Sequence, residues 1–351
     1  MDFTFDSQQL AFRDAVRKLL LIEAAPEILR EIWETETGRS KELRHKFAEQ
    51  GLTALSVPEE HGGLGLGDLD WALVAHELGY YAIPDSLSAT AYLAADLLTQ
   101  LPDTAPLKKE WLPRIAEGEI RVSVGHPANP LVSDAQVADL LLLWRDDEIH
   151  ALLPGQFELN LNPSVDLSRR LYSVRWTPTP KSRICDAETG RRVWAHVFDR
   201  GALCAAGQLV GLAQRMLDLG VDYAAQRKQF GKPIGAFQAV KHHLADVAVK
   251  IEFAKPVLYR AAYALQYGEP MAPMLVSHAK LACGDAAWVA ARKSIQVHGA
   301  IGYTWEADLQ MFMKRAWALD AAWGDRGHHK ARVVESILRD DAPIGPGETF
   351  A

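Results

Sequence analysis

Two short strings in the last third of the chain combine residue types that suit the binding of a dinucleotide. The first string runs from Tyr223 to Ile234 and contains Arg227, Gln229 and Phe230, and Gln238 follows eleven residues after the arginine. Arginine carries a planar, permanently charged fork of N–H donors, which matches the geometry of a pyrophosphate. The amide of Gln238 offers a donor and an acceptor for the adenosine half.

The second string runs from Gln296 to Glu306 and contains Gly299, Ala300 and Gly302. Backbone can approach a cofactor closely only where side chains are absent, as at glycine. Gln296 adds a second amide that can pair with an adenosine. We therefore expect the two strings to form one cofactor site.

The elements that must position these strings fall into three zones. Residues 1–118 have mainly helical periodicity, residues 119–198 contain short β-friendly runs, and residues 199–340 return to long apolar helical stripes; residues 341–351 form a tail. The strands are expected at 120–124, 140–144, 149–153, 172–176 and 193–198. This order predicts an α+β chain that is mainly α, with separate layers and no alternating βαβ units.

Composition excludes several classes of function. The formal net charge is −7, and no basic cluster indicates nucleic-acid binding. The acidic N-terminus is unlike a signal peptide, and no apolar run is long enough to span a membrane. Three widely spaced cysteines predict neither a disulfide framework nor a metal site. The composition favours a cytoplasmic protein.

Together these strings resemble two segments of the acyl-CoA dehydrogenase family, and residues 57–67 are similar to its N-terminal V-P-E-x-x-G-G-x-G segment. The resemblance implies an N-terminal helical domain, a small middle β domain and a C-terminal four-helix bundle. It also implies FAD held across a subunit boundary, an acyl-CoA substrate, and electron-transfer flavoprotein as the electron acceptor. Ala300 replaces the second glycine of the family pattern, so we expect its methyl group to crowd the adenosine site.

The family places its catalytic glutamate at one of two positions, and neither position carries a carboxylate here. The corresponding residues are Trp323 and Gly201, which cannot act as bases. Asp199 and Asp325 lie near these positions in sequence and are weak candidates, because solvated or capping aspartates are the simpler interpretation. We assign no catalytic residue.

The middle zone departs from the family as well, because residues 122–130 lack its usual Thr and Ser-Asp pair, so we predict a reduced β domain. Three hypotheses remain open. The chain is the non-catalytic subunit of a heterotetrameric (α2β2) enzyme, as in bacterial steroid side-chain dehydrogenases, beside a homologous catalytic subunit. Alternatively, it is a self-dimer with a relocated base. A third hypothesis is a flavin-free CoA-ester-binding or scaffold protein. The acyl group stays open, with a steroid side-chain CoA ester as one candidate.

Overall fold

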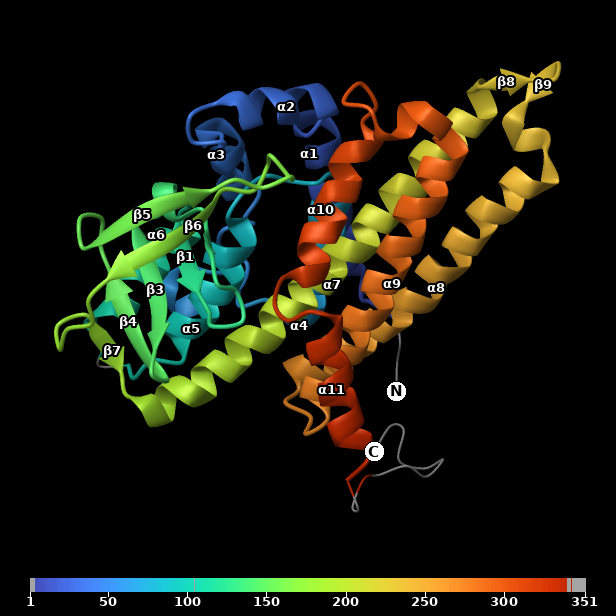
Figure 1. The fold of residues 1–351 in the computed structure, drawn as a ribbon. Coiled ribbons are helices and arrows are strands. Elements are labelled where there is room, and N and C mark those ends of the chain that lie inside the picture. Colours follow the sequence, from blue (N-terminus) through green and yellow to red (C-terminus); the bar gives the residue numbers. More distant parts are fainter. Residues whose placement is uncertain (1–3, 104, 340–341, 343–351) are drawn as a thin grey trace. The chain divides into compact units, whose positions relative to one another are not determined.

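The computed structural model describes residues 4–103, 105–339 and 342 (Figure 1). The chain divides into two compact units, each assembled from separate stretches of sequence. The helical unit comprises Met1–Ile22, Asp68–Ala82 and Ala202–Ala351, and the mixed unit comprises Glu23–Gly67 and Ile83–Gly201. Within the described ranges, no helix combines the length and the hydropathy needed to cross a bilayer.

The helical unit is built around long helices, with α9 packed against α8, α10 and α11. Its elements are α1 (Ser7–Glu23), α4 (Asp68–Tyr80), the second part of α7 (Ala187–Gln226), the strands β8 (Lys228–Gln229) and β9 (Lys232–Pro233), α8 (Gln238–Gln266), α9 (Ala272–His298), the 3-10 helix η5 (Gly299–Tyr303), α10 (Leu309–Ala321) and α11 (Arg326–Ile337). The buried face of α9 is rich in alanine, which allows its neighbours to approach closely. The expected C-terminal helix bundle is present.

Glycines bring α4 and α7 into direct backbone contact. A Cβ atom at Gly79 would lie 2.1 Å from the carbonyl oxygen of Gln208, and one at Gly211 would lie 2.0 Å from that of His76. Neither obstacle is a flexible side chain that can move aside. The crossing of these two helices therefore depends on glycine at both positions.

The mixed unit combines helices with two small sheets. Its helices are α2 (Pro26–Glu34), α3 (Lys41–Glu49), the π-helical segment η2 (Ser88–Ala94), α5 (Ala95–Thr99), α6 (Pro106–Ala116) and the first part of α7. One sheet has the order β1 (Val122–Gly125), β3 (Leu140–Arg145), β4 (Glu148–Leu152) and β7 (Arg183–Cys185), with β1 and β3 parallel. The other is antiparallel, in the order β2 (Val132–Ser133), β6 (Leu171–Trp176) and β5 (Phe157–Asn162). Apolar side chains from both sheets share one core, which includes Val132, Leu141, Leu152, Tyr172 and Trp176.

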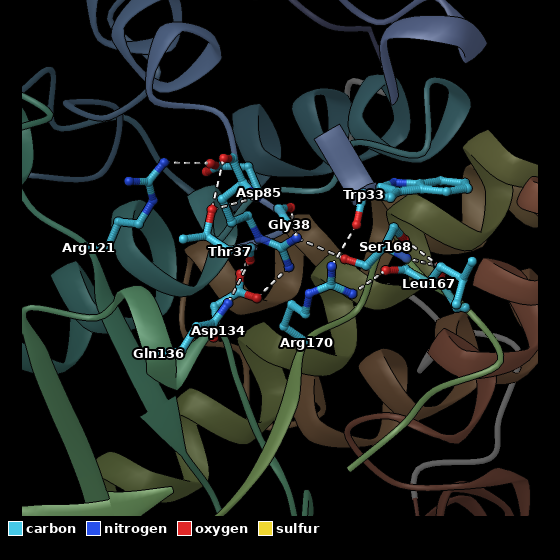
Figure 2. A network of polar contacts seen from close by, with 12 residues as sticks. Trp33, Thr37, Gly38, Asp85, Arg121, Asp134, Gln136, Leu167, Ser168 and Arg170 are labelled. Carbon is cyan, nitrogen blue, oxygen red and sulfur yellow. Dashed lines mark hydrogen bonds and ion pairs between the residues drawn. The ribbon is translucent and has the colours of Figure 1, made fainter. Parts of the chain in front are cut away.

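A buried polar network ties the loop between α2 and α3 to the sheet region within this unit (Figure 2). The Arg39 guanidinium forms an ion pair with Asp134 and donates to the carbonyl of Ser168 at 2.9 Å. Arg170 donates to the carbonyl of Trp33 at 2.6 Å, and its own carbonyl accepts from the amide of Asp134 at 2.8 Å. Because a buried charge without its partner is costly, removing one member of the Arg39–Asp134 pair would strongly destabilise the unit.

The predicted fold class is confirmed, but one predicted strand is wrong. Residues 193–198 lie inside α7 and form no strand. The apolar side chains there recur at helical spacing, and Val193, Trp194, Val197 and Phe198 are all buried. The prediction followed their β-friendly residue types, whereas burial of one helix face decided the local structure. The other predicted strands correspond to β1, β3, β4 and β6, while β2, β5 and β7 of this unit and the short hairpin strands β8 and β9 were not predicted.

Candidate functional site

The hairpin after α7 presents the first string at one end of the helical unit (Figure 1). β8 pairs with β9 through a two-residue turn, and its central residues, Phe230 and Gly231, have φ of +51° and +78°. Positive φ at both positions is the signature of the type I′ turn, whose twist matches that of paired strands. The turn leaves the side chain of Phe230 91% exposed at the hairpin tip.

Arg227 stands at the base of this hairpin. Its amide donates to the carbonyl of Tyr223 at 2.8 Å, and its carbonyl accepts from the amide of Ile234 at 2.8 Å. Its guanidinium is exposed and has no hydrogen-bond or ion-pair partner among the residues that the structure describes. The backbone is therefore held on both sides while the charged donor fork stays available.

The second string forms the end of α9 and the 3-10 helix η5. Local backbone conformation and packing explain the glycines there. Gly299 has φ of +66° and ψ of −145°, a region that only glycine adopts readily, and no atom lies within 4 Å of the place of a Cβ. Gly302 is buried, and a Cβ there would lie 2.9 Å from the Cβ of His298. Sequence reasoning explained both glycines by close approach of a cofactor. The structure adds the local turn and its packing as causes.

Contacts between α7 and α9 bring the two strings together. The Tyr223 ring stacks on the His298 ring, with centroids 4.4 Å apart and planes at 21°. One turn earlier, the Ser294 hydroxyl donates to the carbonyl of Met216 at 2.8 Å. Burial lowers the pKa of His298, so the ring is neutral and packs as an aromatic surface. Sequence analysis did not select Tyr223, although its place one helical turn before Arg227 was a usable signal.

All but one of the predicted cofactor residues are exposed to solvent. Gln238 begins α8, and Gln296 lies in the last turn of α9. Gly302 is the buried member of the predicted set, and the others are exposed: Arg227, Gln229, Phe230, Gln238, Gln296, Gly299 and Ala300. One permanent positive charge, three amide side chains and an open glycine turn form a surface that can hold an anionic dinucleotide.

The loop between α10 and α11 contains Trp323, which the sequence resemblance predicts to stand at one of the two positions of the family's base. Trp323 is half-buried and has φ of +57°, which is rare for a bulky residue. The fully buried His329 donates from Nε2 to the Trp323 carbonyl at 2.8 Å. Lys280 of α9, also buried, donates to the carbonyl of Asp320 at 2.9 Å. The last turn of α10 and the loop that follows it are thus each held by one hydrogen bond from a buried side chain.

Asp325 and Asp199, the two weak candidates for the base, lie in different surroundings. Asp325 caps α11, because its carboxylate accepts from the amide of His328 at 2.8 Å, and this hydrogen bond is the main cause of its lowered pKa. A carboxylate held in its charged form by a helix terminus is a weak base. Asp199 and Gly201 are both buried in the part of α7 that belongs to the mixed unit, whereas Trp323 and Asp325 belong to the helical unit.

Comparison with known proteins identifies the family. The profile described as "Acyl-CoA dehydrogenase, N-terminal domain" matches residues 6–119, and the one described as "Acyl-CoA dehydrogenase, C-terminal domain" matches residues 188–338. This chain belongs to the acyl-CoA dehydrogenase family. Members of this family are oxidoreductases that act on acyl-CoA thioesters, and they depend on FAD.

Relatives of this acyl-CoA dehydrogenase homologue match it over most of their length. It is 33% identical over 309 residues to acyl-CoA dehydrogenase IpdE2 of Mycolicibacterium smegmatis, covering 87% of this chain and 90% of the relative. The structure of butyryl-CoA dehydrogenase from Megasphaera elsdenii aligns with a TM-score of 0.86 at 23% identity, covering 97% and 100% of the two chains. The ChsE4–ChsE5 complex from Mycobacterium tuberculosis aligns with a TM-score of 0.83 at 21% identity, covering 96% and 99%.

Proposed function

We propose that this chain is the non-catalytic subunit of a heteromeric acyl-CoA dehydrogenase. It contributes the pyrophosphate and adenosine contacts of FAD, while a homologous partner contributes the base that removes the α-proton of the acyl-CoA substrate. The electrons leave to an electron-transfer flavoprotein. Bound FAD supplies a hydride acceptor for the substrate β-carbon, which is chemistry that amino-acid side chains do not offer.

One feature carries this proposal, namely the residue at the position that the sequence resemblance assigns to the family's base. Trp323 has no proton-accepting group, and the hydrogen bond from His329 holds its backbone in place. The nearby Asp325 is engaged as a helix cap. Proton abstraction from a thioester α-carbon needs a positioned base, and at this position the chain offers none.

The cofactor surface supports the other half of the proposal. The Arg227 guanidinium is exposed and has no partner within the described chain, so no ion pair has to break when it meets a pyrophosphate. The open turn at Gly299 presents backbone without a side chain. These features fit the diphosphate and adenosine half of FAD.

Exposed aromatic side chains on the helical unit support a partner subunit. Phe230 is 91% exposed, Phe253 74%, Tyr303 68% and Trp305 62%. Large aromatic residues are enriched at protein interfaces, and their exposure to water is unfavourable. The structural similarity to a chain of the ChsE4–ChsE5 complex is in line with such an assembly.

The experiment is to produce the chain alone and together with each candidate homologue, and to measure flavin content and acyl-CoA oxidation. We expect the chain alone to be inactive and the two-chain complex to be yellow and active. Straight-chain and steroid side-chain CoA esters both serve as test substrates, because the identity of the acyl group is not assigned. An active protein from this chain alone would overturn the proposal. A complex that stays colourless would instead favour a scaffold without flavin chemistry.

A charge-removing variant tests the cofactor surface separately. Arg227→Ala removes a charge-assisted hydrogen bond worth about 1.5–3 kcal/mol, so we expect the complex to bind FAD roughly 10–100-fold more weakly. Arg175→Ala is the matched control, because Arg175 is an exposed arginine on β6 in the mixed unit. Flavin retention after gel filtration is the readout. Equal retention in the two variants would remove Arg227 from the site.

A further inference from the structure

A cavity lies in the helical unit, far from the cofactor surface. It has a volume of about 340 Å³ and is lined by the segment before α1, the start of α1, the start of α4 and the last turns of α8. Gln238 of the cofactor surface begins α8, and the cavity residue Tyr263 lies about 38 Å further along that helix, at 1.5 Å per residue. The cavity is therefore separate from the dinucleotide surface.

Four aromatic side chains stand in the wall of this cavity. Tyr259, Tyr263 and Tyr267 follow one another at four-residue intervals at the end of α8, so they share one side of it. The Phe5 ring comes from the segment before α1 and lies 4.8 Å from the Tyr259 ring between centroids, with the two planes at 90°. The Tyr263 and Tyr267 rings lie 4.5 Å apart with their planes at 43°. The rings therefore form walls at angles to one another and not a flat stack.

A wall of inclined aromatic rings favours a cation as the occupant. The face of each ring carries the negative part of its quadrupole, and a cation within about 6 Å of the ring centre is attracted to it. Rings at angles to one another let a single occupant contact more than one of them. A primary ammonium would lose hydrogen bonds to water among these rings, whereas a quaternary ammonium has no N–H donor to satisfy.

The arginine in the wall does not make the cavity positive. Arg260 Nη2 forms an ion pair with Glu269 at 2.6 Å, and its Nε and Nη1 atoms are buried and face no open space. Its guanidinium carbon lies 6.0 Å from the centre of the Tyr263 ring, at the outer limit of a cation–π contact. Arg13 on α1, whose charge reaches the cavity wall, is likewise paired, with Asp14 at 2.7 Å. Both positive charges are therefore balanced by carboxylates of their own.

Asp6 gives the cavity a negative charge. Its Oδ1 accepts from the backbone amides of Gln8 and Gln9, each at 2.8 Å, which holds the carboxylate at the start of α1. Its Oδ2 accepts no hydrogen bond, and the carboxylate forms no ion pair, within the part of the chain that the structure describes. Because the Arg260 charge is already balanced, the Asp6 carboxylate is left to attract a cation to the mouth of the aromatic wall.

We propose that this cavity binds a trimethylammonium group, as carried by choline. The methyl groups contact Phe5 and the three tyrosines, and the positive charge lies near Asp6. The volume is at the small end of the range for ligand pockets, which is about 300–1,000 Å³, so it suits a compact group of this size. The site does not depend on the role proposed above for FAD.

The test compares ligands of the same shape that differ in charge. Choline and 3,3-dimethyl-1-butanol, in which carbon replaces the nitrogen, are titrated into the full-length chain by ligand-observed NMR. We expect choline to bind about tenfold more tightly than 3,3-dimethyl-1-butanol, and also more tightly than ethanolamine, which lacks the methyl groups. Absence of choline binding at millimolar concentration would overturn the proposal, and so would equal affinity for choline and 3,3-dimethyl-1-butanol. Equal affinity for ethanolamine would identify a plain ion pair at Asp6 and overturn it as well.

Variants of the rings connect the binding to the cavity. Tyr263→Leu and Tyr267→Leu each remove one ring and should weaken choline binding about fivefold, whereas Tyr263→Phe keeps the ring and should bind normally. Tyr267→Leu is safe for folding, because this residue is 61% exposed. Tyr303→Leu, at an exposed tyrosine of η5, is the control and should bind normally. Unchanged affinity in both leucine variants of the cavity would place choline elsewhere and refute the site.

A charge variant and a vesicle assay complete the test. Asp6→Asn removes the charge but keeps a side chain that caps a helix, so it should weaken choline binding and leave 3,3-dimethyl-1-butanol binding unchanged. Equal loss for the two ligands would show that Asp6 acts through the fold and not through its charge. Sedimentation with phosphatidylcholine vesicles that free choline reverses would assign the trimethylammonium group to a lipid headgroup, and absence of sedimentation would assign it to a free small molecule.

Discussion

Two buried histidines should make the stability of this protein fall steeply in mild acid. Burial lowers the pKa of both His126 and His329 from 6.5 to about 4. His126 is 8% exposed; its Nδ1 accepts from the amide of Ala128 at 3.0 Å, and its Nε2 lies 3.2 Å from the carbonyl of Trp194. This arrangement needs a neutral ring with its proton on Nε2. A second proton on Nδ1 would break the hydrogen bond from Ala128.

The loss of stability in acid follows because the unfolded chain binds protons at a higher pH than the folded chain does. The unfolded chain protonates these histidines as the pH falls through about 6.5, whereas the folded chain resists until about pH 4. Their stabilising effect is therefore complete above pH 6.5 and is lost between pH 6.5 and 4. Lowering the pKa from 6.5 to about 4 corresponds to about 3 kcal/mol of stability for each histidine. Two such losses are a large part of a typical unfolding free energy of about 5–15 kcal/mol.

The assay is urea unfolding at a series of pH values from 7 to 4. His126→Asn keeps an acceptor for the Ala128 amide but does not titrate, so its unfolding free energy should fall about 3 kcal/mol less than that of the parent over this range. His329→Gln should behave in the same way, because its amide can still donate to the Trp323 carbonyl. His242→Gln, at an exposed position on α8, is the control. If the His126→Asn and His329→Gln curves run parallel to the parent curve, the assigned burial effect is wrong.

Two further predictions concern local packing and capping. Gly79→Ala places a Cβ 2.1 Å from the Gln208 carbonyl, so the unfolding free energy from a thermal melt should fall by about 2 kcal/mol or more. In the control Gly327→Ala, at an exposed position in the first turn of α11, the Cβ meets only the Asp325 carboxylate at 3.3 Å, so the change should stay within about 1 kcal/mol. Asp325→Ala removes the α11 cap and should lower the unfolding free energy, whereas Asp325→Asn retains the cap. Turnover of the assembled enzyme should survive both Asp325 substitutions; loss of turnover in Asp325→Asn would instead identify this carboxylate as a base.

Some of the fold could be predicted from local pattern, and some could not. The short runs that form β1, β3, β4 and β6 were predicted because they are rich in residues that favour strands and are bounded by residues that favour turns. Residues 193–198 have the same residue types, but their apolar positions face one side of α7. β5 was not predicted, although its apolar residues Phe157, Leu159 and Leu161 alternate with polar ones, which is itself the local signal of a half-buried strand. Its pairing with β6 was not visible in the local sequence.

For the candidate site as well, some features follow from the sequence and others only from the tertiary structure. The sequence by itself determined that Trp323 and Gly201 carry no carboxylate, because folding cannot change which atoms a side chain contains. It also determined the residue types around Arg227 and Gly299. Only the tertiary structure decided that Tyr223 stacks on His298 and so joins two strings separated by about seventy residues. It also decided the burial of His329, because burial depends on neighbours that sequence distance does not reveal.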